Sequence, residues 1–242
     1  MLAPQTARRS TDVDRILRVA SYNLRDFKDD SNAAVRVVRA MNADVLCLQE
    51  VPRHPFSSYR IASFAARCGL SWSGGHHGSG GTTVMSSLRV DAANVAHIPL
   101  KVRGRFERQR GYALSQVRLP GYRSVSFVSI HLSLDADERA AHAVAVMKAL
   151  PEGTPLVVAG DLNEGSDGRA WMAVGRRLRA VTGDAPTFPA RNPHHRTDAI
   201  FASQQLSAVP SDPIKMDPGD LAAATDHLPV WVDLDLAGIA AH

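Results

Sequence analysis

The stretch Pro155-Leu156-Val157-Val158-Ala159-Gly160-Asp161-Leu162-Asn163-Glu164-Gly165 decides the fold class. Its short apolar run is bounded by a proline and a glycine, which is the pattern of a buried strand. Side chains two residues apart on an extended chain point to the same face, so Asp161 and Asn163 are expected to lie together where this strand ends. On this stretch alone, a polar turn that caps the strand and a functional site at its carboxyl end fit equally well.

Outward from this stretch, the chain has the pattern of an α/β protein. Apolar runs predict strands at residues 16–24, 44–50, 82–86, 95–100, 112–119, 124–131, 157–159, 197–203 and 228–236. Apolar residues at helical spacing predict helices at 34–41, 61–68, 135–150 and 171–178. Ser31 or Asn32 is the expected cap of the first helix. Residues 210–220, rich in proline and aspartate, are predicted to be a connection.

The length and composition favour one globular domain. The chain has 242 residues, of which 45% are hydrophobic and 21% charged, and it shows no internal repeat or dividing linker. We expect a flexible N-terminal tail at residues 1–14, a single domain at 15–236 and a C-terminal tail at 237–242. Cys47 and Cys68 lie in apolar segments and are predicted to be core residues, not a disulfide or a metal site.

The net charge of +4 and the pI near 9.4 are compatible with a polyanionic partner. A run of arginines, Arg103, Arg105, Arg108 and Arg110, is most simply interpreted as a solvated face. No stretch has the features of a secretory signal or approaches the roughly 18 apolar residues that a membrane span needs. We therefore expect a cytoplasmic monomer without a stable membrane anchor.

Polar side chains end one predicted strand after another. They are Asn23, Glu50, His131, Asp161, Asn163, Asp198 and the pair Asp226-His227. If these ends meet, they form an acidic pocket, and carboxylates in a dry cleft repel one another unless a counter-ion is present. Carboxylate and amide oxygens suit Mg²⁺ or Mn²⁺ better than zinc. Such a metal with histidines beside it is typical of enzymes that cleave or transfer phosphate groups. Taken singly, Asp198 also fits a turn position and Asp226 a strand cap.

Six motifs follow one another along the chain. They are Ser21-Tyr22-Asn23, Leu48-Gln49-Glu50-Val51, Ser129-Ile130-His131-Leu132, Ala159-Gly160-Asp161-Leu162-Asn163, Arg196-Thr197-Asp198-Ala199-Ile200-Phe201 and Thr225-Asp226-His227-Leu228-Pro229-Val230. In type and order they resemble the motifs of the endonuclease/exonuclease/phosphatase superfamily, which includes DNase I, abasic-site endonucleases, neutral sphingomyelinases and inositol polyphosphate 5-phosphatases. The six motifs cover nearly the whole chain. The resemblance implies a four-layer α/β sandwich of the DNase I-like kind, with two mixed β-sheets packed face to face and helices outside.

The resemblance also implies a metal and substrate site. Glu50 would be the main ligand of a Mg²⁺ ion, or of Mn²⁺ in its place, with Asn23 and Asp226 close to the ion. Asn23, Asn163 and Arg110 would contact the substrate, and Asn163 would hold the phosphate or the attacking water. Arg110 is also compatible with an ordinary solvated arginine.

The resemblance further implies the catalytic roles. Asp161 would orient or deprotonate the attacking water. His227 would contact the scissile phosphate, while Asp198 would orient its imidazole and keep it protonated. His131 would be a second imidazole on the phosphate or leaving-group side.

Two departures argue against abasic-site repair in particular. Arg25 stands two residues after Asn23, where abasic-site enzymes carry a carboxylate, and the segment before Asp198 lacks their tryptophan.

The predicted function is a Mg²⁺-dependent phosphoesterase, an endonuclease or exonuclease that cleaves phosphodiesters in DNA, so nucleic acid is the expected substrate partner. The alternatives are a phosphatase or phosphodiesterase for a lipid or small-molecule phosphate ester, and a catalytically silent binding module.

Overall fold

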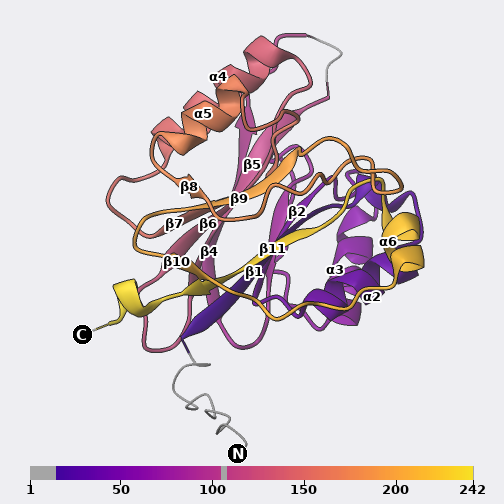
Figure 1. The fold of residues 1–242 in the computed structure, drawn as a ribbon. Coiled ribbons are helices and arrows are strands. Elements are labelled where there is room, and N and C mark those ends of the chain that lie inside the picture. Colours follow the sequence, from indigo (N-terminus) through magenta and orange to yellow (C-terminus); the bar gives the residue numbers. More distant parts are fainter. Residues whose placement is uncertain (1–14, 105–107, 242) are drawn as a thin grey trace, which may run out of the picture.

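The apolar runs of the sequence form two mixed β-sheets that pack face to face in the computed structural model, which describes residues 15–104 and 108–241 (Figure 1). Sheet A has the order β10 (Ser207–Val209), β11 (Val230–Asp235), β1 (Ile16–Asn23), β2 (Val45–Gln49), β3 (Thr83–Ser86). Within it β1 and β2 are parallel, and the other pairs are antiparallel.

Sheet B has the order β4 (Asp91–Leu100), β5 (Arg110–Arg118), β6 (Val125–His131), β7 (Leu156–Asp161), β9 (Asp198–Ala202), β8 (Arg179–Ala180). Its one parallel pair among the described strands is β6 with β7. The inner faces of the two sheets enclose a core in which Val19, Phe127 and Val157 are fully buried. Each sheet is therefore sealed on its inner face by the other.

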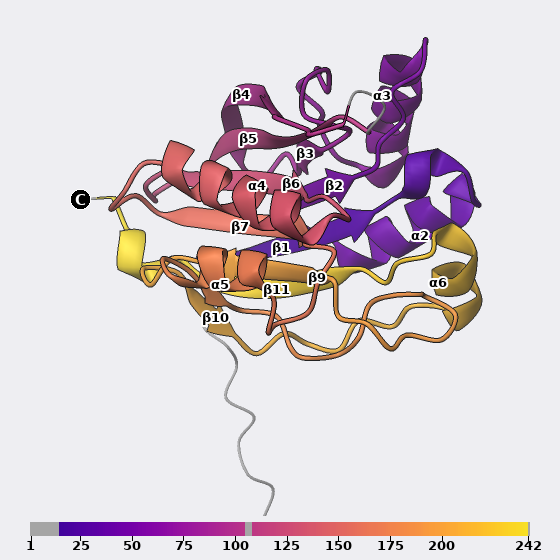
Figure 2. The ribbon, with the colours of Figure 1, turned by 90° about the horizontal axis from the view of Figure 1, so that it is seen from above.

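Helices cover the outer faces and complete four layers (Figure 2). On sheet A these are α2 (Ser31–Met41), α3 (Ser57–Cys68) and α6 (Pro218–Ala224), which pack with the outward side chains of β1 and β2. On sheet B they are α4 (Ala136–Ala149) and α5 (Arg169–Gly175). Two short 3-10 turns, η1 (Arg25–Phe27) and η2 (Ala237–Ile239), follow β1 and β11. The predicted α/β sandwich is confirmed.

The structure corrects several local predictions. Asp30, not Ser31 or Asn32, caps α2, because its carboxylate accepts from the backbone N–H groups of Asn32 and Ala33. The helix predicted at 61–68 begins at Ser57, and β4 begins at Asp91. The connection predicted at 210–220 contains the start of α6. The predicted C-terminal tail folds onto the domain, since Ile239 of η2 is buried in the core between the sheets. The predicted N-terminal tail lies outside the described residues.

None of the helices in residues 15–104 and 108–241 combines the length and the hydropathy needed to cross a membrane.

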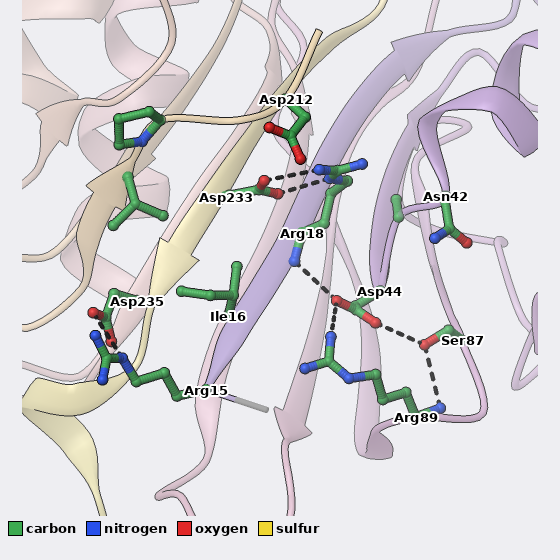
Figure 3. Close-up of a pocket in the computed structure, with 13 residues that line it drawn as sticks. Arg15, Ile16, Arg18, Asn42, Asp44, Ser87, Arg89, Asp212, Asp233 and Asp235 are labelled. Atoms are coloured by element: carbon green, nitrogen blue, oxygen red, sulfur yellow. Dashed lines mark hydrogen bonds and ion pairs between the residues drawn. The ribbon is translucent and has the colours of Figure 1, made fainter. Parts of the chain in front are cut away.

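A cavity of about 650 Å³ at the amino end of β1 is lined by charges that pair with one another (Figure 3). The Arg18 guanidinium donates to both carboxylate oxygens of Asp233 on β11, at 2.7 and 2.8 Å. The backbone N–H of Arg18 donates to the Asp44 carboxylate, which also forms an ion pair with Arg89. This region joins the first and last long strands of sheet A, and we assign it a structural role.

We expect Asp233→Asn to lower the free energy of unfolding by about 2 kcal/mol at pH 7, because the substitution removes a two-pronged hydrogen bond to a charged group. Burial raises the pKa of Asp233, but the hydrogen bond and charge of Arg18 outweigh it and hold the pKa below its usual value. A carboxyl group whose pKa is lower in the folded state than in the unfolded state stabilises the fold at pH values above its unfolded pKa, which is near 4 for aspartate. This stabilisation is lost as the pH falls through the pKa of the folded state.

The difference between variant and wild type should therefore shrink below about pH 4, as measured by urea unfolding followed through tryptophan fluorescence. Asp91→Asn is the matched control, because Asp91 makes an exposed cross-strand pair with Arg118 and should change little. A constant difference between pH 7 and pH 3 would contradict the assignment.

Candidate active site

Strand register aligns three of the predicted site residues. His131 at the end of β6 is the partner of Asp161 at the end of β7, and Asp161 is in turn the partner of Asp198 at the start of β9. Directly paired residues present their side chains on the same face of a sheet. A glycine precedes Asp161 because a Cβ atom at Gly160 would collide with the carbonyl oxygen of Ile130 on β6. The register of sheet B therefore places one imidazole and two carboxylates in a row.

Sheet A contributes the residue that crosses to this row. Asn23, at the end of β1, is buried, and its Nδ2 donates to Asp161 Oδ2 over 3.1 Å. Below this contact Gln49 donates to the hydroxyl groups of Ser21 and Ser129, and Ser129 donates to the Leu48 carbonyl. These buried polar contacts join β1 and β2 to β6 and fix the relative position of the two sheets under the site.

Asp161 has nitrogen atoms on several sides. Its Oδ2 lies 3.5 Å from His131 Nε2 and 3.8 Å from His227 Nε2, in addition to the Asn23 bond. Burial, and then the nearby charge of Asp198, raise the pKa of Asp161 to about 7. A carboxylate with this pKa exchanges a proton near neutral pH, as a general base requires.

His227 is held by Asp198. Its Nδ1 lies 2.9 Å from Asp198 Oδ2, which also accepts from the hydroxyl groups of Thr187 and Thr197. Burial lowers the pKa of His227, but the charge and hydrogen bond of Asp198 outweigh it and raise the pKa to about 9. His227 is therefore an imidazolium at neutral pH, with Nδ1–H directed to Asp198 and Nε2–H on the side of Asp161.

His131 is the opposite case. It is fully buried, and burial followed by the charges of Arg110 and His227 holds its pKa well below the ordinary value. A neutral imidazole therefore lies between Asp161 and Glu50, whose Oε1 is 3.9 Å from His131 Nε2. The site thus combines one charged and one neutral imidazole, which divides the two histidines into different chemical roles.

The two outer carboxylates are paired with arginines. Glu50 accepts from Arg108 Nη1 over 2.9 Å, and Asp226 lies 3.3 Å from Arg25 Nε. Glu50 has a positive φ of 50°, a conformation that costs energy outside glycine and is common at functional sites. Its carboxylate is held by Arg108.

The predicted metal ligands differ from the tightest acidic cluster of the described residues. That cluster is Asp161, Asp198 and His227, whose ligand atoms lie within 4.8 Å of one another. Asp198 Oδ2 accepts three hydrogen bonds, one of them with His227, and so holds the imidazole, whereas its buried Oδ1 has no hydrogen-bond partner among the described residues. Glu50 and Asp226 are carboxylates neutralised by side chains that a cation can replace. Carboxylate oxygens are the ligand type that Mg²⁺ and Mn²⁺ prefer, so the chemistry of Glu50 and Asp226 suits such an ion.

Asn163 lies beside Asp161 but has local partners. It has a positive φ of 54°, its backbone N–H donates to Asp161 Oδ1, and its Nδ2 donates to the Leu132 carbonyl. These contacts fix the orientation of Asp161. The amide oxygen and the second amide hydrogen of Asn163 remain for a substrate or water.

Arg110 is buried, not solvated. It is 7% exposed, and its Nη1 has no hydrogen-bond partner among the described residues. Its backbone packs against Gly80, where a Cβ atom would lie 2.7 Å from Arg110 Cα. A buried guanidinium with an unused donor is suited to an anionic ligand.

Sequence reasoning missed two further members of the site. Arg108 was expected on a solvated face, but it bonds Glu50 and Asp26, and Arg25, noted only as a departure, pairs with Asp226. Arg105 lies outside the described residues. The sequence offers no local signal for Arg108, since its partners are 58 and 82 residues away.

Comparisons with known proteins agree with the fold. A model of the Endonuclease/Exonuclease/phosphatase family matches residues 20–227. No curated protein matches the chain. A solved endonuclease/exonuclease/phosphatase from Beutenbergia cavernae is similar, with 23% identity, a TM-score of 0.71, and coverage of 92% of this chain and 72% of that one.

Two other solved structures are similar at lower identity. The human Nocturnin catalytic domain with bound sulfate shares 16% identity, with a TM-score of 0.67 and coverage of 91% of this chain and 93% of that one. The Bacteroides thetaiotaomicron mannosyl-6-phosphatase Bt3783 shares 18% identity, with a TM-score of 0.65 and coverage of 90% and 99%.

Proposed function

Because the chain belongs to the endonuclease/exonuclease/phosphatase family, whose members hydrolyse phosphate esters, we propose that it is a divalent-metal-dependent phosphodiesterase. The substrate that we propose for it is DNA. The observation that carries this proposal is the pairing around Asp161. A buried carboxylate with a pKa near 7 faces an imidazolium that a second carboxylate, Asp198, keeps charged. These are the two groups that in-line attack of water on a phosphate ester needs.

The proposed roles follow from the protonation states. Asp161 accepts the proton of the attacking water, and Asn23 and Asn163 keep its carboxylate oriented. His227 Nε2–H donates to a phosphate oxygen as charge develops there, and Asp198 prevents loss of that proton. Arg110 Nη1 donates to the same phosphate, and neutral His131 receives or gives a hydrogen bond on the leaving-group side.

Glu50, with Asn23 Oδ1 and Asp226 nearby, would hold Mg²⁺ or Mn²⁺. Such an ion polarises the phosphate and stabilises the leaving oxygen. Arg108 and Arg25 pair with Glu50 and Asp226, so two guanidinium groups would lie next to a bound ion. The basic composition, +4 with a pI near 9.4, supports a polyanionic substrate.

We expect the purified protein to cleave plasmid DNA and bis(p-nitrophenyl) phosphate with Mg²⁺ or Mn²⁺, to lose this activity in EDTA, and to regain it when Mg²⁺ is returned. Gel electrophoresis and absorbance at neutral pH measure the two reactions. Activity unchanged by EDTA would contradict the metal-dependent mechanism. Turnover rates measured for RNA, sphingomyelin, inositol phosphates and p-nitrophenyl phosphate, beside DNA, rank the substrate classes.

A second candidate function is hydrolysis of a lipid or small-molecule phosphate ester. An apolar pocket of about 390 Å³ adjoins the site, since its lining includes Thr187, which bonds Asp198, and Leu228, next to His227. Its apolar lining includes Trp231, Met216 and Leu221. Faster turnover of an apolar monoester or of sphingomyelin than of DNA would favour this candidate over the first.

A further inference from the structure

We propose that a second, non-scissile phosphate of the substrate binds in a cationic pocket beside the active site, a proposal that rests on the proposed function. The pocket has a volume of about 430 Å³, and its charged lining consists of Lys28, Arg53, Arg60, Arg108 and a single carboxylate, Asp26. Four cations face one anion. The pocket therefore has the charge and the size for a phosphate group.

The pocket and the active site share a side chain. Arg108 donates through Nη1 to Glu50 and through Nη2 to Asp26, so one guanidinium separates the proposed metal ligand from the pocket. A substrate whose scissile phosphate lies at Arg110 and His227 can therefore direct a neighbouring phosphate into the pocket. Successive phosphates of a nucleic acid strand and the two phosphates of a bisphosphorylated small molecule share this chemistry.

The cations come from four separate segments of the fold. Lys28 follows η1, Arg53 lies between β2 and α3, Arg60 lies on α3, and Arg108 precedes β5. Arg60 is placed by its own contacts, because its guanidinium lies 5.7 Å from the Phe27 ring centroid and donates to the Phe27 carbonyl. Folding thus converges cations that the sequence disperses over some 80 residues.

The cations are not fully compensated. Arg53 donates to the Gln109 carbonyl, and Lys28 lies 3.6 Å from Asp26. Burial and then the charge of Arg108 lower the pKa of Arg53, and burial and Arg108 also lower the pKa of Arg110. Glu50 and Asp26 compensate the charge of Arg108, but the charges of Arg53 and Arg110 are disfavoured and would gain stability from a bound anion. Arg110 does not line the pocket, but it lies close enough to Arg108 and Arg53 for their charges to act on it.

The test compares two chromogenic diesters with the same scissile bond. Thymidine 5′-(p-nitrophenyl phosphate) has one phosphate, and its 3′-phosphorylated form adds a non-scissile one. In the wild type the extra phosphate should raise kcat/KM at least about tenfold, chiefly through KM, since it gains hydrogen bonds between charged groups. In the Lys28→Gln/Arg60→Gln variant the ratio should fall toward one, with hydrolysis of the single diester unchanged.

Arg67→Gln is the matched control, because Arg67 lies on the same helix, carries the same charge and bonds Asn32 away from the pocket. It should keep the wild-type ratio. If the double variant is unstable, Lys28→Gln alone serves as the test, because Lys28 is largely exposed and its substitution should leave the fold intact. It should lower the ratio of kcat/KM between the two substrates. A wild-type ratio of one, or a ratio that Lys28→Gln and the double variant leave intact, would overturn the proposal.

Inorganic phosphate separates this proposal from the proposed function. In a calorimetric titration with EDTA present, the double variant should bind one phosphate fewer than the wild type, whether or not any ester is hydrolysed. Equal binding would overturn the subsite even if hydrolysis is observed. Competition against the 3′-phosphorylated substrate by a DNA tetranucleotide or a sugar bisphosphate identifies the source of the second phosphate, and competition by neither would also contradict the subsite.

Discussion

His227→Gln is expected to lower kcat/KM for the phosphodiester about 10³-fold, because in the proposed mechanism the imidazolium donates to the developing phosphate charge beside the proposed base Asp161. Glutamine keeps a hydrogen-bond donor of similar length but carries no charge. The fold should persist, since His227 Nδ1 contacts a carboxylate that also bonds Thr187 and Thr197. Steady-state kinetics with bis(p-nitrophenyl) phosphate measure the loss, and circular dichroism checks the fold.

Asp198→Asn should act through His227 and therefore change the pH profile. The wild-type imidazolium is present below a pKa of about 9 and is lost as the pH rises through that value. Without the Asp198 charge the folded pKa falls, so activity should decline at a lower pH than in the wild type. NMR titration of the His227 ring reports the same shift directly. Near wild-type activity for His227→Gln would show that another group stabilises the phosphate.

Glu50→Gln should weaken Mg²⁺ or Mn²⁺ binding at least about tenfold and remove most of the metal-dependent activity, because it deletes the charge of the proposed principal ligand. Calorimetry with Mn²⁺ measures the binding without reference to turnover. Excess Mg²⁺ should restore part of the activity if the loss is one of affinity.

The control for this variant is Asp29→Asn, which removes the same charge from a carboxylate that pairs with Arg25 at the surface. Its metal affinity should remain close to that of the wild type. If Glu50→Gln binds Mn²⁺ as well as the wild type does, the ion belongs instead with Asp161, Asp198 and His227, the tight cluster of the described residues.

The strand ends were predictable because the signal for each one is local. A run such as Val157 to Ala159 followed by Gly160 and Asp161 marks both a buried strand and its edge. The convergence of Asn23 with Asp161 came only from the resemblance, since a single sequence does not reveal pairing across 138 residues. Sequence reasoning therefore named the members of the central row, and the structure supplied their order and contacts.

Other features depend on tertiary contacts and were missed for that reason. Arg108 resembles any surface arginine until folding brings it to Glu50 and Asp26. The helix α6 had a local signal, Asp217 as N-cap and Pro218 in the first turn, but it is only seven residues long and lies in a proline-rich connection. Short elements fixed by packing carry too little periodicity to be recognised.

The pairing of β1 with β11 has a consequence for the newly made chain. Arg18 and Asp233 are 215 residues apart, and the site takes Asn23 from the first of these strands and His227 from the segment before the last. A chain still in synthesis contains Asn23 and Glu50, the proposed metal ligands, long before it contains His227. At roughly 5–20 residues per second, the capacity for hydrolysis arrives only when translation is nearly complete. In the proposed mechanism, an unfinished chain therefore lacks the imidazolium that hydrolysis needs.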